Sequence, residues 1–312
     1  MLIKYNIRQA NLYVRDNGFM STKKQDYIRY LSEDRIDDFK SVSGLAKLLT
    51  LIKNDKEQRF QLEIRQNYVT VYYNGGKLSN IKKGRDGNYT TDFNINYCKN
   101  QGKDSANLTQ IEEIGKHDIQ AFVDNIGIYT AEMDAWFTRH PKAERANQQI
   151  ICKKFRQQND VLNLLDIEFV LQSARFDMLG VNNNGTIKLI ELKVGNKALS
   201  SAQDSRLNKP KCGIYKHYLD FLHIAKNNEL ANAVVHSAIN IINARKKLGL
   251  ATFNGKVNND PSCIKFEVWL ADYSAKGIAL AREIQMIEQN GRNADIIKIN
   301  PPFLTEIKKN YK

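Results

Sequence analysis

The chain has 312 residues, of which 42% are hydrophobic, so it can bury the core of one large domain or of two. Its first residues lack the apolar stretch of a signal peptide and no apolar run is long enough to cross a bilayer, so we expect a cytoplasmic protein without a membrane partner. Four widely spaced cysteines and five scattered histidines form no zinc or disulfide pattern, and we assign them no chemistry.

The net charge of +13 is unevenly distributed along the chain. Residues 1–135 carry 20 Lys and Arg against 18 Asp and Glu, whereas residues 136–312 carry 27 against 16. We place a domain boundary between these two parts. The basic excess of the second part predicts a polyanionic partner, which we expect to be nucleic acid and more specifically DNA. A basic surface that serves solubility alone is the alternative.

The first part, residues 1–135, is predicted to be the smaller, α+β domain. Apolar residues indicate an opening strand within residues 2–14, and a polar helical stretch then runs to about residue 53 with an interruption at 41–44. Alternating residues from 60 to 73 and the turn at 74–76 indicate an antiparallel meander with one exposed face. A helical pattern extends from 107 to about 137. We expect this domain to serve recognition, regulation or dimerisation, so a homodimer is one arrangement that it allows.

The second part, residues 136–312, alternates helices and strands. A helix opens at His140-Pro141, LNLLDIEFVLQ forms a strand, and the strands around Asp177 and Glu191 come next. Two helices follow, one from Pro210 and one over about 230–248, and then a strand at 263–271, a helix at 277–289 and a closing strand at 295–300. This order predicts an α/β fold in which a mixed central sheet is flanked by helices.

The turn NNNG joins two of these strands and brings polar side chains together. If residues 183–185 form a three-residue loop with its glycine in the left-handed conformation, Asp177 lies directly across from Glu191. Lys193 then falls on the same face, with Arg175 opposite it. A one-residue slip in the loop would instead place Asp177 and Glu191 on opposite faces.

Such a polar cluster is costly inside an apolar hairpin. Without partners its burial would cost several kcal/mol, so the groups must line a cleft, pair with one another or hold an ion. Two neighbouring carboxylates also repel each other, and a divalent cation would relieve that repulsion. The alternative is a satisfied cluster of ion pairs at the end of an ordinary hairpin.

These residues carry a resemblance to a known family. Asp177 in ARFDMLGV, Glu191-Leu192-Lys193 in LIELKVG and Glu144 on the preceding helix resemble the motif of the PD-(D/E)XK nuclease superfamily, which has the restriction-endonuclease-like fold. The resemblance covers roughly residues 138–300, and the order of helix, three strands, helix and strand matches the core of that family. It implies metal-dependent hydrolysis of phosphodiester bonds, usually in DNA. Mg²⁺ would be the cofactor, and we expect Mn²⁺ to substitute for it.

The resemblance also implies a role for each motif residue. Asp177 and Glu191 would supply oxygen ligands to Mg²⁺, joined by the backbone carbonyl of Leu192. Lys193 would orient or deprotonate the attacking water and offset the negative charge that grows in the transition state. Glu144 would bind a second metal through water or position the other ligands. A solvated residue in the first turn of a helix is the alternative for Glu144.

Further basic residues lie near this motif in the sequence. We consider contacts to the phosphate backbone for four side chains, namely Arg175, Lys209, Lys211 and Lys216. For Arg175 an ion pair with Glu191 is the preferred alternative, and for the three lysines the alternative is a solvated face. For Glu168 we predict a salt bridge at the edge of the sheet, with a role as an extra acidic ligand as the alternative.

Two rival functions stay open at this point. A binding or assembly module could keep the fold without the reaction, because fold alone does not fix function. The substrate could also be RNA, because the predicted chemistry acts on a phosphate that both nucleic acids contain.

Overall fold

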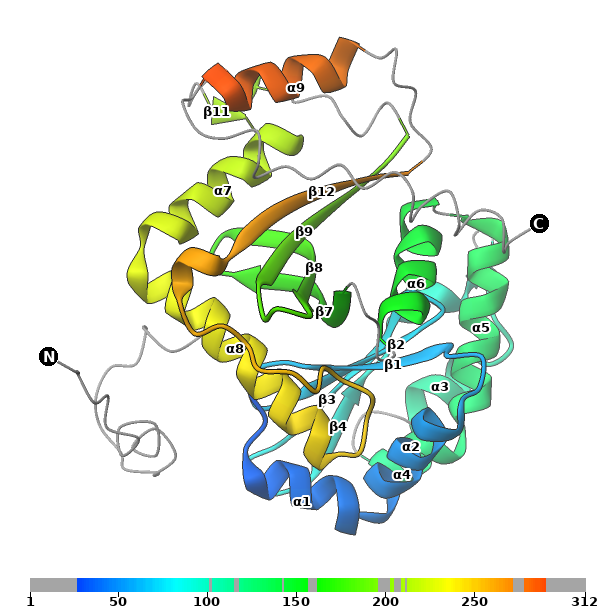
Figure 1. Cartoon of the computed structure of the whole chain (residues 1–312). Coiled ribbons are helices and arrows are strands. Elements are labelled where there is room, and N and C mark those ends of the chain that lie inside the picture. Colours follow the sequence, from blue (N-terminus) through cyan, green and yellow to red (C-terminus); the bar gives the residue numbers. More distant parts are fainter. Residues whose placement is uncertain are drawn as a thin grey trace, which may run out of the picture.

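A computed structural model describes residues 27–100, 103–114, 118–141, 143–156, 162–195, 203–204, 209–210, 212–271 and 278–289. It is a mixed α/β fold with two four-stranded sheets and helices packed around them (Figure 1). The strands predicted at 2–14 and 295–300 lie outside the described residues. None of the helices that the structure describes combines the length and the apolar character that a membrane span needs.

The elements of the first part follow the predicted order, except that two short strands at 99–100 and 103–104 were not predicted and that three helices replace the single helix expected over 107–137. They are α1 (Glu33–Ser41), α2 (Ser43–Asn54), β1 (Phe60–Ile64), β2 (Val69–Tyr73), β3 (Gly76–Lys83), β4 (Tyr89–Asp92), β5 (Lys99–Asn100), β6 (Lys103–Asp104), α3 (Leu108–Ile114), α4 (Ile119–Asp124) and α5 (Ile126–Arg139). The predicted antiparallel meander is confirmed as the sheet β1-β2-β3-β4. Asn74 and Gly75 both have positive φ, as a tight turn between β2 and β3 requires.

The expectation that this sheet has one exposed face holds for β3 and β4, where Lys77, Lys82 and Asp92 are exposed, but was wrong for β1 and β2. All five residues of β2 are buried. Helix α2 packs against α4 and β1 within the first part, and Tyr72 of β2 packs into an apolar cluster with Ile151 and Phe155 from the second part. An alternation of apolar and polar residues in the sequence does not show whether the polar face of a strand is covered by other elements. The burial of these strands therefore follows from tertiary packing.

The second part contains the other sheet. Its elements are α6 (Ala143–Phe155), β7 (Leu162–Leu171), β8 (Ala174–Asn182), β9 (Ile187–Val194), β10 (Gln203–Asp204), β11 (Lys209–Pro210), α7 (Ile214–Lys226), α8 (Asn228–Lys247), β12 (Lys265–Ala271) and α9 (Ile278–Gln289). The helix expected from Pro210 begins one turn later, at Ile214, because Pro210 belongs to β11 and Gly213 adopts a positive φ of 95°.

The predicted mixed sheet flanked by helices is confirmed in the order β12-β9-β8-β7. Strands β7, β8 and β9 pair antiparallel, and β12 joins β9 in parallel. Apolar residues of α6, including Ile151 and Phe155, pack with Met178 and Ile190 on one face of this sheet. Helices α7 and α8 cover the other face, where Leu189 is buried (Figure 1).

The hairpin between β8 and β9 has the predicted register. Gly185 has a φ of 82°, and its amide donates to the Asn182 carbonyl at 3.0 Å, so residues 183–185 form the three-residue loop. The strand pairs run from Val181 opposite Ile187 to Met178 opposite Ile190. The next residues towards the open end of the hairpin are Asp177 and Glu191, which therefore belong to facing positions.

Buried ion pairs connect the two sheets. Asp166 of β7 is fully buried and accepts hydrogen bonds from Arg65, which follows β1, and from Nε of Arg29 at 3.1 Å. Glu63 of β1 pairs with Arg156 at the end of α6. One apolar cluster also includes residues from both parts of the chain, and residue 135 lies inside α5. The division into two domains near that residue stays a prediction.

Candidate active site

Asp177 and Glu191 lie at the open end of the hairpin, where β8 and β9 stop pairing. Among the described pairs, the last one between these strands joins Met178 and Ile190. Beyond it, Oδ2 of Asp177 accepts a hydrogen bond from the backbone amide of Leu192, with 2.7 Å between the two atoms. The carboxylate therefore takes the place of a backbone acceptor, and the two strands separate around it.

The carboxylate of Glu191 is buried, and the described residues hold it through one of its oxygens. Glu191 is 3% exposed. Its Oε1 interacts with the ammonium of Lys193 and lies 3.0 Å from Nε2 of His217. Its Oε2 is buried and has no hydrogen-bond partner among the residues that the structure describes. Because an unpartnered buried carboxylate oxygen is costly, this atom is a candidate ligand for a cation.

The surroundings shift the ionisation of this cluster. Burial, and after it the charge of Glu191, raises the pKa of Asp177 to about 7, although the Leu192 amide and Lys193 act in the opposite direction. Burial alone would lower the pKa of Lys193, but the neighbouring carboxylates, with Glu191 contributing most, together outweigh burial and raise that pKa above its usual value. Lys193 is therefore an ammonium at neutral pH. The two acids share one site that favours a bound positive charge.

Helix α6 borders the site on the face of the sheet opposite α7 and α8. The exposed Glu144 lies in its first turn, and its charge raises the pKa values of both Asp177 and Lys193. Gln148, one turn further on, donates from Nε2 to the backbone carbonyl of Asp177 at 3.1 Å. The predicted proximity of Glu144 to the motif therefore agrees with its electrostatic influence, and Gln148 fixes the helix to β8.

Sequence reasoning missed His217. This residue of α7 places its ring between two strands, with Nδ1 3.1 Å from the carbonyl oxygen of Arg175 and Nε2 next to Glu191. No spacing in the sequence marks it, because it lies on a different element from either contact. Only the packing of α7 on the sheet brings it to the carboxylate.

The predicted ion pair between Arg175 and Glu191 was wrong. Arg175 instead pairs with Glu168 on β7, which confirms the salt bridge predicted for Glu168. Glu168 has a positive φ of 56° and faces Asp177, between the strand pairs Ile167–Met178 and Phe169–Phe176. Because Arg175 pairs with Glu168 on β7, the Glu191 carboxylate interacts with Lys193 and His217 instead.

The other predicted phosphate contacts are only partly described. Lys216 forms an ion pair with Asp220 one turn along α7. Lys209 belongs to the short strand β11, and Lys211 lies outside the described residues. The 62% exposed side chain of Arg175 is accessible to a ligand in spite of its ion pair.

The residues present fit a hydrated divalent cation. In the described parts of the chain, no group of three or more His, Cys, Asp or Glu side chains could hold a metal ion. Mg²⁺ in proteins is commonly held by one or two carboxylates, with water and substrate phosphate completing its shell. Asp177 and Glu191 can supply those carboxylates. The amide and carbonyl of one strand residue point the same way, so the Leu192 carbonyl faces the same gap as Asp177.

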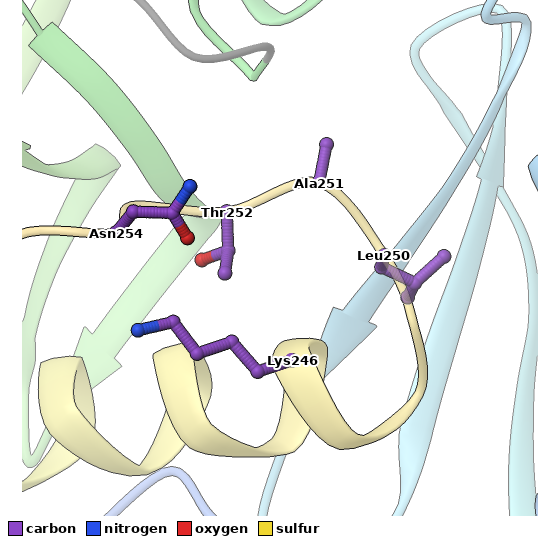
Figure 2. A pocket seen from close by; sticks show the side chains of 5 residues that line it. All are labelled: Lys246, Leu250, Ala251, Thr252 and Asn254. Carbon is purple, nitrogen blue, oxygen red and sulfur yellow. The ribbon is translucent and has the colours of Figure 1, made fainter.

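A cavity of about 300 Å³ lies elsewhere, at the end of α8 (Figure 2). It is lined by Lys246, Leu250, Ala251, Thr252 and Asn254. The segment that follows it contacts the loop of the hairpin, where the amide of Asn258 donates to the Gly185 carbonyl at 2.9 Å. The cavity is therefore near the loop end of the hairpin, whereas the paired acids are at its open end.

Comparison of the chain with protein-family models, with curated proteins and with solved structures gave no match. The function is therefore inferred from the site itself. The chemistry available there comes from two neighbouring carboxylates, a buried oxygen that has no partner in the described part of the chain, and the ammonium of Lys193.

Proposed function

We propose that this protein is a Mg²⁺-dependent nuclease that hydrolyses phosphodiester bonds in DNA. The observation that carries this proposal is the buried Oε2 of Glu191, which has no partner among the described residues, beside the carboxylate of Asp177, whose pKa is raised by burial and then by the charge of Glu191. A divalent cation would satisfy that oxygen and stabilise both charges. Mn²⁺ would fill the same position.

The side chains of the site suit phosphodiester hydrolysis. A bound Mg²⁺ would polarise a phosphoryl oxygen and lower the pKa of a bound water. Asp177 and Glu191 would hold the ion, with the Leu192 carbonyl as a further ligand. Because the pKa of Lys193 is raised, its ammonium would orient the water and offset charge on the phosphoryl oxygens rather than accept a proton.

Two features beyond the site support the same proposal. The succession of α6, the strands β7, β8 and β9, the helices α7 and α8 and the parallel strand β12 resembles the restriction-endonuclease-like core. The basic excess of residues 136–312 would attract a polyanion to the half of the chain that holds the acids.

Cleavage assays with purified protein test this proposal. Plasmid, single-stranded DNA and RNA are incubated with Mg²⁺, Mn²⁺ or a chelator, and we expect DNA cleavage that the chelator abolishes. The variants D177N, E191Q and K193M should each lose at least about 100-fold in rate while circular dichroism shows an intact fold. Lys47→Met, at an exposed position on α2, is the matched control and should cleave normally.

The pattern of results separates the rivals. Unchanged cleavage by all three site variants would refute the proposal. DNA binding without metal-dependent cleavage would instead favour a binding module of the same fold, and cleavage confined to RNA would favour the RNA-directed alternative.

A further inference from the structure

The two strands that carry the acids separate at the site and form a fork. Past Met178 and Ile190, β8 stays paired with β7, as in the pair of Arg175 with Val170. Strand β9 stays paired with β12 up to Val194 (Figure 1). We call the gap between residues 174–177 of β8 and residues 191–194 of β9 the fork. It is the place where the proposed cation would bind.

Among the described residues, two side chains bridge the fork. Asp177 reaches across from β8 to the amide of Leu192. His217 enters from α7 and contacts both sides, because Nδ1 lies 3.1 Å from the Arg175 carbonyl of β8 and Nε2 lies 3.0 Å from Oε1 of Glu191 on β9. The side chain of His217 is 18% exposed, so solvent competes little for these contacts.

The ring contact decides which oxygen of Glu191 is available. A glutamate carboxylate rotates broadly about its last torsion unless its oxygens are held. Both Lys193 and His217 hold Oε1, and Oε2 is left buried without a partner among the described residues. In the proposed reaction the ammonium of Lys193 would leave Oε1 and interact with the attacking water and the phosphoryl oxygens. His217 is then the contact that keeps Oε1 in place.

We propose that His217 is a positioning residue that fixes Glu191 in the fork with Oε2 directed at the divalent cation. This inference rests on the proposed function and adds to it a residue from a different element of the fold. A partner that orients a metal ligand typically accounts for about 10–100-fold in metal affinity or activity.

Two conservative variants separate positioning from mere packing. In Gln the amide nitrogen lies near the place of Nε2 and can still donate to Glu191, whereas in Asn it lies near the place of Nδ1 and can reach only the Arg175 carbonyl. Binding of Mn²⁺ and of Mg²⁺ alone to the full chain is measured by calorimetry. We expect H217N to weaken metal binding by about 10–100-fold and H217Q to retain most of it. Thermal unfolding of both variants should resemble that of the wild type.

The exposed His223, further along α7, provides the matched control, and H223N should bind metal like the wild type. Equal affinity of H217N and wild type would overturn the role of His217 while leaving the proposed function intact. Equal loss in H217N and H217Q, with lowered thermal stability, would show a packing role instead. A wild-type protein that neither binds metal nor cleaves DNA would overturn the proposed function, and this inference with it.

Discussion

Asp177 of β8 accepts a hydrogen bond from the backbone amide of Leu192 in β9, with 2.7 Å between Oδ2 and the nitrogen. This bond stabilises the charged carboxylate, but burial and the nearby Glu191 outweigh it and raise the pKa of Asp177 to about 7. The folded protein therefore binds a proton at Asp177 more tightly than the unfolded chain does, where the usual value is 3.8. Protonation and cation binding at this site are alternatives.

The raised pKa of Asp177 predicts that this residue makes stability fall with rising pH. Its contribution to the free energy of unfolding is fully present below the unfolded value and is lost as the pH rises through the folded value of about 7. Between about pH 5 and about pH 8 the loss should be on the order of 2 kcal/mol. Urea unfolding gives the free energy of unfolding of wild type and of D177N at both pH values. The loss is the change, between the two pH values, in the difference between these free energies.

The variant D177N keeps an oxygen for the Leu192 amide but cannot titrate, so other groups cancel in the comparison. Adding Mg²⁺ at the higher pH should restore stability to the wild type and not to D177N, since a ligand of the folded state stabilises it. A difference between the two proteins that is independent of pH would contradict the assignment.

The register of the hairpin was predictable from sequence because local chemistry determines it. Gly185 can adopt the positive φ that a three-residue loop needs, and the observed strand pairs show that the one-residue slip, which the sequence left open, does not occur. Once the loop is set, Asp177 and Glu191 must face each other. The element order of the second part followed from similarly local patterns.

Contacts between distant elements were not predictable. His217 contacts Glu191 because α7 packs on the sheet. Arg175 pairs with Glu168 because β7 is the neighbour of β8 on the side away from β9. The pairing of Asp166 with Arg29 and Arg65 joins residues more than a hundred positions apart, and no periodicity reports such a contact.

A methyl group at Gly185 should destabilise the protein through the hairpin loop. The φ of this residue is 82°, and an added Cβ would lie 2.3 Å from the carbonyl oxygen of Lys256. We expect G185A to lower the free energy of unfolding by about 1–3 kcal/mol in urea titrations. The control is G127A in α5, where a Cβ meets nothing within 4 Å and should leave stability equal or higher. Equal stability of G185A and wild type would contradict the loop conformation.

Nucleic-acid affinity should depend steeply on salt. If the basic excess contacts phosphates, the logarithm of the binding constant falls linearly with the logarithm of salt concentration. Each of R175A and K216A should lower the magnitude of that slope by about 1 if its side chain contacts a phosphate. Fluorescence anisotropy without divalent metal measures the slopes, and K47A, on α2, is the control. An affinity indifferent to salt would exclude phosphate contacts, and a slope unchanged in K216A would leave Lys216 only its ion pair with Asp220.

The buried carboxylate of Asp166 should be essential for joining the two sheets. It is fully buried and accepts from Arg29 and Arg65, so D166N leaves two guanidinium groups with an uncompensated charge. We expect a loss of about 3–5 kcal/mol in the free energy of unfolding, measured by urea denaturation. The exposed pair of Glu33 with Lys247 is the control, and E33Q should cost at most about 1 kcal/mol. If D166N unfolds like E33Q, the network between the sheets contributes little, and the two parts of the chain are held together by their shared apolar core instead.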